Sequence, residues 1–184
     1  MIVIISGTNR PGSNTRKVAA RVDASYKLLG VKTQVLDLAD LPPEIFAATS
    51  YAEKPADFKT KFTDAILAAD GLVIVTPEYN GGVPGVLKYF IDMLPFPESF
   101  EQRPVCFVGL AAGIWGALRP VEQLQAIFGY RNALIYPERV FMPGIGKLLD
   151  SGGHFTNQDI PVRLEKQAQG FVDFVEKLRG KKLK

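Results

Sequence analysis

The sequence predicts a doubly wound α/β sandwich, in which helices cover both faces of a parallel β-sheet. Short apolar runs rich in β-branched residues alternate along the chain with longer segments whose apolar residues have helical spacing. The short runs are apolar throughout, as is typical of strands buried on both faces. The chain has 184 residues, of which 47% are hydrophobic. That size suits one domain with its own core, so we expect a single domain over residues 1–184.

Five strands and five helices are expected in alternation. The strands are the runs of consecutive apolar residues: Ile2–Ile5, Thr33–Leu38, Leu72–Thr76, Val105–Leu110 and Ala133–Tyr136. The helices are the segments that follow them: Asn14–Leu29, Ala56–Ala69, Pro84–Leu94, Gly116–Phe128 and Ile160–Leu178. Three connections are long enough to be functional lids, interface arms or mobile segments: Ala39–Pro55, Pro95–Arg103 and Met142–Asp159.

Composition argues against several classes of protein. The formal net charge of +3 is too small for a typical nucleic-acid-binding surface. The basic residues near the C-terminus are expected to form a solvated helix end: Lys177, Arg179, Lys181, Lys182 and Lys184. With only Cys106 and His154, the chain can form neither an intrachain disulfide nor a structural zinc site of four soft ligands. We therefore expect no metal and a reducing, cytoplasmic location.

No membrane partner is expected. The apolar start Met1–Ile5 is followed at once by Ser6 and Gly7, and it lacks the basic region and the cleavage site of a signal peptide. No segment approaches the run of about 20 apolar residues that spans a bilayer.

The loop after the first strand, residues 7–15, is the first candidate binding segment. It leads from a strand into a helix, at the edge of the sheet where α/β proteins bind ligands, so its donors can converge on an anion. The candidate donors are Thr8, Ser13, Asn14 and Thr15, which Arg10 can join. Gly7 and Gly12 have the spacing of a Walker A loop, but Ser13 replaces the essential lysine, which excludes that class. The loop suits a phosphate monoester, although Gly, Ser and Asn also cap ordinary helices.

The loops after the third and fourth strands are the next candidates. In residues 77–82, Pro77, Gly81 and Gly82 permit tight turning and leave backbone N–H groups free to face a flat polar ring. Tyr79 can pack against such a ring and Asn80 can hydrogen-bond to it, or the segment is a plain turn with a surface tyrosine. The glycine-containing loop 111–116 lies at the same edge.

Several single residues have a functional and a plain interpretation. His154 could donate a proton, but a lone loop histidine is more often solvated. Cys106 lies in an expected central strand, which favours a small core residue. Trp115 could stack on a ring, although a core or interface role is more common. Phe96 and Phe100, next to prolines, are expected to be exposed and to make a subunit contact.

Two segments resemble a known family. The run Gly7–Thr15 resembles the phosphate loop of the NADPH-dependent FMN reductases, and Thr76–Lys88, with Pro-Glu-Tyr-Asn followed by Pro-Gly-x-Leu-Lys, resembles their flavin-cradling segment. The resemblance extends from Met1 to about Leu178. This family includes chromate, quinone and azo-dye reductases.

The resemblance implies a flavodoxin-like three-layer sandwich with a five-stranded parallel sheet in the order 2-1-3-4-5. It also implies bound FMN, with NADPH or NADH as co-substrate, and hydride transfer through FMN to a small acceptor such as a quinone, an azo dye, a metal oxyanion or free flavin. A homodimer or homotetramer is implied as well. No catalytic side chain is expected, because the flavin itself carries the chemistry.

Carried onto this sequence, the resemblance assigns twelve binding residues. It puts five at the FMN phosphate: Thr8, Arg10, Ser13, Asn14 and Thr15. It puts five along the flavin ring: Pro77, Glu78, Tyr79, Asn80 and Gly81. Ala112 and Gly113 would close the other edge of the ring.

The sequence departs from the family pattern at a few positions. Thr8 and Gly82 replace common serines, and Tyr89 and Phe90 replace smaller or polar residues. Thr8 keeps a hydroxyl, whereas the other changes bear on ring access or on a subunit contact. Two alternatives remain open: an electron carrier of the flavodoxin type without direct use of NAD(P)H, and a non-catalytic interaction protein that has kept the fold.

Overall fold

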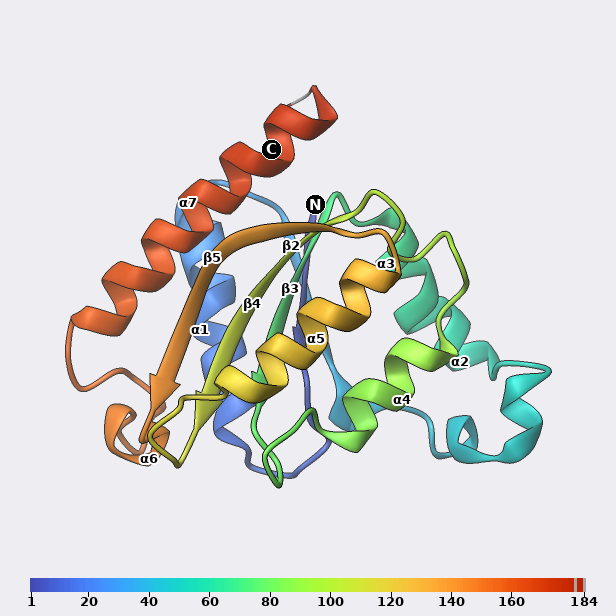
Figure 1. The fold of residues 1–184 in the computed structure, drawn as a ribbon, viewed down its shortest axis with the longest axis horizontal. Helices are drawn as coiled ribbons and strands as arrows, with labels where there is room; N and C mark the ends of the chain where they lie inside the picture. The colour runs from blue at the N-terminus through green and yellow to red at the C-terminus, as the bar shows by residue number, and fades with distance from the viewer. Residues whose placement is uncertain (181, 184) are drawn as a thin grey trace.

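A computed structural model describes residues 1–180 and 182–183. Five parallel strands form one sheet in the order β2-β1-β3-β4-β5, which confirms the order that the resemblance implied (Figure 1). The strands are β1 (Ile2–Ser6), β2 (Thr33–Asp37), β3 (Gly71–Pro77), β4 (Pro104–Ala111) and β5 (Leu134–Pro143). The first four agree with the prediction to within one residue at each end.

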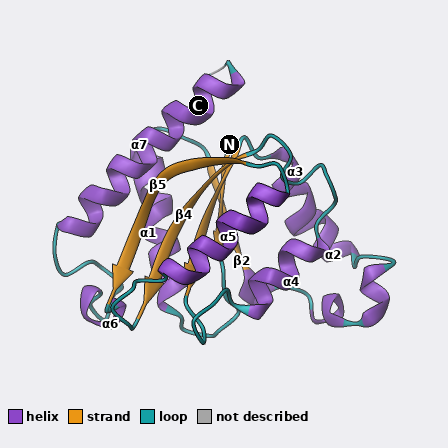
Figure 2. Ribbon diagram, viewed as in Figure 1, coloured by secondary structure: helices purple, strands orange, loops and turns teal. Residues whose placement is uncertain are grey.

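Helices cover both faces of the sheet, as the alternation predicted (Figure 2). One face carries α1 (Asn14–Leu28) and α7 (Asp159–Arg179). The other carries α4 (Gly85–Met93), α5 (Leu118–Tyr130) and a helical segment made of α2 (Ala56–Phe58), the π-helix η4 (Lys59–Thr63) and α3 (Asp64–Ala68). The five predicted helices are therefore confirmed, with a π turn inside the second.

The central strands supply two hydrophobic cores at once. In β1, Val3 and Ile5 pack on the face covered by α4 and α5, while Ile2 and Ile4 pack on the face covered by α1 and α7. Neighbouring residues of β3 and β4 divide in the same way. Burial on both faces is the reason these strands are apolar without alternation. This burial on both faces fixes where each strand ends, and therefore where the loops at the carboxyl edge of the sheet begin.

The predicted fifth strand was too short. β5 continues past Tyr136 through Pro137, Glu138 and Arg139. In the sequence, the apolar run ends before this proline and these two charged residues, so the strand was expected to end there. The strand lies at the sheet edge, where solvent exposure and proline are tolerated. Three of its residues, 136–138, oppose the single residue Cys106, so the ladder to β4 is interrupted by a bulge.

A buried glutamine of α7 repairs this interruption. The Gln167 side-chain amide donates hydrogen bonds to the carbonyl oxygens of Phe107, at 3.0 Å, and of Glu138, at 2.9 Å. Gln167 is only 3% exposed, so its two donors satisfy backbone acceptors that the bulge would leave unpaired. The contact holds the edge strand and α7 together at the bulge.

The long connections contain short helices that the sequence did not predict. Residues 38–51 form three 3-10 helices, η1 (Leu38–Asp40), η2 (Pro43–Phe46) and η3 (Ala48–Tyr51). The Tyr89 hydroxyl of α4 donates to the Ile45 carbonyl at 2.7 Å and ties this segment to the fold. The third connection contains α6 (Ile145–Leu148) and begins only after β5 ends at Pro143.

The prediction of an exposed Phe100 was wrong, whereas Phe96 is 65% exposed as expected. Phe100 is 1% exposed, with its ring centroid 4.8 Å from that of Phe128 and 4.7 Å from the Arg131 guanidinium carbon. The turn after α4 folds back under the end of α5, which buries this ring. Proline content indicated the turn but not its direction.

Cys106 is a buried core residue, as predicted. Burial raises the pKa of its thiol well above the ordinary value, which disfavours the reactive thiolate.

The described basic residues of the tail are exposed, as expected, although two of them also form ion pairs. Arg179 pairs with Asp70 at 2.7 Å and Lys182 pairs with Glu176 at 2.8 Å. Lys181 and Lys184 lie outside the described residues. Among the helices described, none combines the length and the apolar character needed to cross a membrane.

Gln167 offers a test of the bulge. We expect Gln167→Met to lower the free energy of unfolding by about 1–3 kcal/mol, because one buried and one partly buried carbonyl lose their donors. Gln169→Met, on the exposed side of the same helix, should change it by less than about 0.5 kcal/mol. Urea unfolding followed by circular dichroism measures both, and equal stability of the two variants would contradict the role of Gln167.

Candidate functional site

A cleft of about 360 Å³ lies at the carboxyl edge of the sheet. Its walls come from the loop after β1, the loop after β3 and the end of β4, and they comprise residues 10–15, 77–79, 110–112 and Ile145. The parallel strands bring these segments to one edge, as the sequence predicted.

The loop after β1 has the features of an anion site. Ser13 caps α1 by accepting a hydrogen bond from the Arg16 amide at 3.3 Å. The backbone N–H groups of Gly12, Asn14 and Thr15 have no acceptor within residues 1–180 and 182–183. The first turn of this 15-residue helix contains no acidic residue, so the positive end of its dipole is uncompensated.

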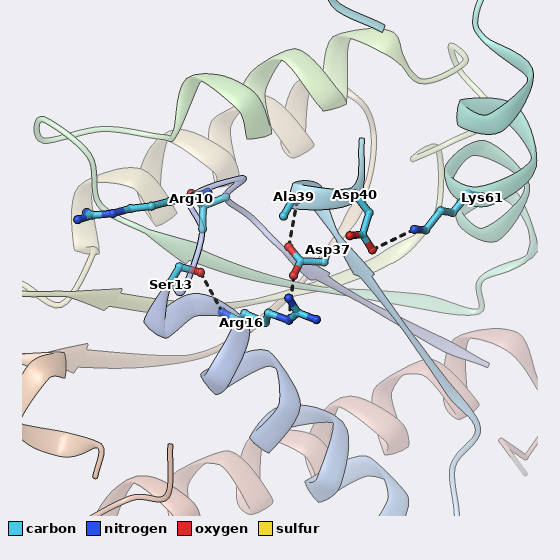
Figure 3. A network of polar contacts seen from close by, with 8 residues as sticks. Arg10, Ser13, Arg16, Asp37, Ala39, Asp40 and Lys61 are labelled. Atoms are coloured by element: carbon cyan, nitrogen blue, oxygen red, sulfur yellow. Dashed lines mark hydrogen bonds and ion pairs between the residues drawn. The ribbon is translucent and has the colours of Figure 1, made fainter. Parts of the chain in front are cut away.

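The two arginines of this region have different surroundings. Arg16 points to the end of β2, where its Nε lies 3.4 Å from a carboxylate oxygen of Asp37. Arg10 lines the cleft, and its side chain extends away from that ion pair (Figure 3). In the described part of the chain the Arg10 guanidinium has no carboxylate partner. Arg10 is therefore the cation left available to an anion in the cleft.

A hydrogen bond joins the first two loops. The hydroxyls of Thr8 and Tyr79 lie 2.8 Å apart, and Thr8 Oγ1 also accepts from the Arg10 amide at 3.2 Å. Thr8 is 1% exposed and therefore supports the loop from behind rather than lining the cleft. Tyr79 does line it, so this bond fixes one wall of the cleft against the other.

The loop after β3 forms a tight turn at Asn80 and Gly81. Both residues have positive φ, at 50° and 75°, and Tyr79 and Gly82 exchange two backbone hydrogen bonds across them. This is a type I′ turn, for which Asn-Gly is the preferred sequence.

The free backbone N–H groups expected in this loop are present at two residues, while two others are used within the protein. The Glu78 amide donates to the Leu110 carbonyl at 3.2 Å, and the Tyr79 amide donates to Gly82 at 3.1 Å. In the residues that the structure describes, only the amides of Asn80 and Gly81 in this loop lack an acceptor. The sequence indicated the turn but could not indicate that β4 would use the Glu78 amide.

The loop after β4 contributes one wall residue of the two predicted. Ala112 lines the cleft, whereas the Gly113 carbonyl accepts a hydrogen bond from the Gly144 amide at 3.3 Å. That contact brings Ile145, the first residue of α6, to the cleft. Sequence reasoning missed Ile145, because nothing in the chain around it indicates that the long connection folds back to this edge.

Eight of the twelve predicted binding residues line the cleft. They are Arg10, Ser13, Asn14, Thr15, Pro77, Glu78, Tyr79 and Ala112. The other four border it, with Thr8 behind Tyr79, Asn80 and Gly81 at the adjoining turn, and Gly113 next to Ala112.

The Glu78 carboxylate is paired with a cation at the rim of the cleft. Its Oε1 lies 3.2 Å from Nη1 of Arg119, and the Glu78 side chain is 13% exposed. Arg119 belongs to the first turn of α5, and its guanidinium carbon lies 5.9 Å from the centre of the Trp115 ring. Trp115 is 54% exposed, so of the core or interface role predicted for it the core role is wrong, and the interface role stays a prediction.

The other ionisable candidates lie apart from this cleft. His154 is an exposed loop residue, as its plain interpretation predicted, and its backbone amide bond to Asp150 lowers the pKa of that carboxyl. Among the described residues, no three His, Cys, Asp or Glu side chains gather closely enough to hold a metal ion.

Fold and cleft together are those of an α/β protein with an anion-binding type of cleft at the carboxyl edge of its sheet. The chain belongs to the NADPH-dependent FMN reductase family, whose model matches residues 1–146. It is thus an oxidoreductase that works with FMN and NAD(P)H, and these comparisons do not favour the electron-carrier alternative.

Individual proteins agree with this assignment. A quinone reductase of Pseudomonas putida KT2440 is 29% identical over 178 residues, which cover 94% of this chain and 90% of that protein. An NADPH azoreductase of Bacillus sp. OY1-2 is 30% identical over 148 residues, 78% of this chain and 77% of the relative. The structure of FerB, a flavoenzyme NAD(P)H:(acceptor) oxidoreductase from Paracoccus denitrificans, has a TM-score of 0.78 at 23% identity and matches 96% of this chain and 97% of its own. This last likeness confirms the flavodoxin-like fold.

The bond between the two loops can be measured by a double-mutant cycle. We expect Thr8→Val and Tyr79→Phe each to destabilise the protein, and the double variant to be more stable than the sum of the two losses by about 0.5–1.5 kcal/mol. Thr15→Val paired with Tyr79→Phe is the control, since Thr15 has no hydrogen bond to Tyr79. Additive losses for the Thr8–Tyr79 pair would mean that the loops are held by other contacts.

Proposed function

We propose that the cleft holds FMN and that the enzyme passes hydride from NADPH or NADH to a small acceptor such as a quinone, an azo dye, a metal oxyanion or free flavin. The observation that carries the proposal concerns the loop after β1, where several backbone donors have no acceptor among the described residues and Arg10 has no carboxylate partner there. Such a set fits a phosphate monoester, because each donor is available to a phosphate oxygen without breaking an internal bond.

The residues at the phosphate end would act by position and charge. Arg10, Ser13, Asn14 and Thr15 would bind the FMN phosphate, with Thr8 holding the loop in shape through Tyr79. The absence of an acidic residue from the first turn of α1 supports this placement, since a carboxylate there would repel a dianion.

The ring would lie between the second and third loops. Pro77, Glu78 and Tyr79 would border one side of it, and Ala112 and Gly113 the opposite edge. The free amides of Asn80 and Gly81 are donors for the polar edge of the ring, where negative charge gathers on reduction. The double pairing of Tyr79 with Gly82 keeps this turn rigid, so these donors need no rearrangement.

Bound FMN supplies the redox chemistry, by taking a hydride from the nicotinamide and releasing two electrons to an acceptor. The chain's own part is to bind, orient and neutralise charge. Arg119 compensates the Glu78 carboxylate, which would otherwise place an unpaired negative charge beside the reduced ring. No side chain needs to act as a nucleophile or a general base.

The acceptor class rests on the relatives. Quinone reductases of Pseudomonas putida and Escherichia coli K12 and the Bacillus azoreductase have names that describe flat, conjugated small molecules as acceptors. A site built for a planar ring and open to solvent at Tyr79 and Ala112 suits acceptors of this kind.

The remaining proposals concern organisation. We expect residues 1–184 to act as one FMN-binding domain, and the chain to form a homodimer or homotetramer. Exposed Phe96 and Tyr130, at 65% and 80%, support a subunit contact on the side of α4 and α5. A reducing, cytoplasmic location agrees with a lone buried thiol.

Anaerobic reduction tests the proposed function. The protein saturated with FMN should lose its visible flavin absorbance when NADPH or NADH is added, and should regain it when benzoquinone is supplied. The control is free FMN at the same concentration. A protein that binds FMN but stays oxidised with both nucleotides would contradict the proposal.

Substitution of Arg10 tests the phosphate site. We expect Arg10→Ala to raise the dissociation constant for FMN about tenfold or more, because a charge-assisted contact contributes about 1.5–3 kcal/mol. Arg16→Ala is the matched control, since Arg16 faces Asp37, and it should change the constant by less than about twofold. Quenching of flavin fluorescence measures both, and equal effects would show that the loop has been assigned wrongly.

A further inference from the structure

Arg119 has binding capacity that its contacts in the protein do not use. Of its five N–H donors only one, on Nη1, meets an acceptor, the Glu78 carboxylate at 3.2 Å. Its side chain is 53% exposed. Within the described residues Arg119 has no other hydrogen bond or ion pair, so most of the guanidinium faces solvent at the rim of the cleft.

The surroundings of Arg119 hold it in one place. The Trp115 ring lies under the guanidinium, and the Arg119 side chain passes within 3.9 Å of the position that a Cβ on Gly81 would occupy. The residue thus touches both loops that would border the flavin ring. A cation fixed by an aromatic ring and a carboxylate has lost much of its rotamer freedom before any ligand arrives.

The position is also electrostatically unfavourable without an anion. Arg119 lies in the first turn of α5, where the helix dipole disfavours a cation, and that turn contains no acidic residue. Glu78 supplies the single counter-charge among the described residues. A dianion approaching the rim would therefore meet a cation that is only partly compensated.

The other two arginines near the cleft already have an assigned ligand or an ion-pair partner. Arg10 lies at the proposed phosphate site of FMN, and Arg16 faces Asp37 on the far side of α1. Among these three arginines, Arg119 alone has both unused N–H donors and a position beside the solvent-facing side of the proposed ring site. The reductant must dock at that face while FMN fills the cleft.

We propose that Arg119 binds the 2′-phosphate of the reductant and makes the enzyme prefer NADPH to NADH, with Trp115 and Glu78 as its positioning residues. The proposal rests on the proposed function, because it needs FMN in the cleft and a nicotinamide dinucleotide as donor. The guanidinium can receive two phosphate oxygens through its unused edge while keeping the Glu78 contact.

Steady-state kinetics at saturating FMN test the assignment. Arg119→Gln should raise KM for NADPH about tenfold and leave KM for NADH within about twofold, because NADH has no 2′-phosphate. Glu78→Gln should act in the opposite sense on the NADPH/NADH preference, since it frees the guanidinium from its carboxylate. The control is Arg139→Gln, an exposed arginine with a glutamine at 3.2 Å and the Phe141 ring at 5.7 Å, which should leave both constants unchanged.

A binding measurement separates recognition from turnover. Calorimetric titration of the FMN-loaded protein with adenosine 2′,5′-bisphosphate should show tighter binding than with AMP, and Arg119→Gln should abolish the difference. An NADPH/NADH ratio of KM that is the same in the wild type and in Arg119→Gln overturns the inference. That result leaves the proposed function intact as long as either nucleotide reduces the flavin; reduction by neither would overturn the proposed function instead.

Discussion

Burial of β1, β3 and β4 on both faces is the constraint on which the rest of the structure depends. Because most residues of these strands pack into one core or the other, no strand can slide without exposing apolar side chains. The carboxyl ends are therefore fixed relative to each other, and the loops that start at Gly7 and Glu78 have fixed origins. The Thr8–Tyr79 hydrogen bond then needs to define only a short stretch of chain.

The chemistry of the cleft comes from groups that the fold leaves unsatisfied. In the part of the chain that the structure describes, helix α1 begins with amides that have no acceptor, and the amides of Asn80 and Gly81 take no part in the hydrogen bonds of their turn. At the β5 bulge, by contrast, the irregular backbone is satisfied within the protein, by the side chain of Gln167. The cleft thus presents donors that a ligand can use in place of water, as expected of a preorganised site.

Much of this could be predicted from the sequence, because local patterns decide it. Apolar runs gave the central strands, and Asn80-Gly81 and Ser13 indicated a turn and a cap. What failed depended on contacts between distant segments. The extension of β5 past Pro137 requires α7 to supply Gln167, the burial of Phe100 requires the end of α5, and Ile145 reaches the cleft only because Gly144 bonds to Gly113. In each case the two contacting segments are far apart in the sequence, whereas hydrophobic periodicity reports only on neighbouring residues.

The distribution of charge around the cleft follows the same logic as its hydrogen bonds. Arg16 is paired with Asp37 at the end of β2. Within the described residues Arg10 has no carboxylate partner, and Arg119 has one partner that meets only one of its donors. An ion pair exposed to water contributes little to stability, so pairing Arg119 with Glu78 costs the enzyme little when a stronger anion arrives. A fully buried or bidentate pair would have closed the rim to ligands. A single contact at 3.2 Å keeps the carboxylate compensated and the cation available, which is what a site that receives an anionic reductant requires.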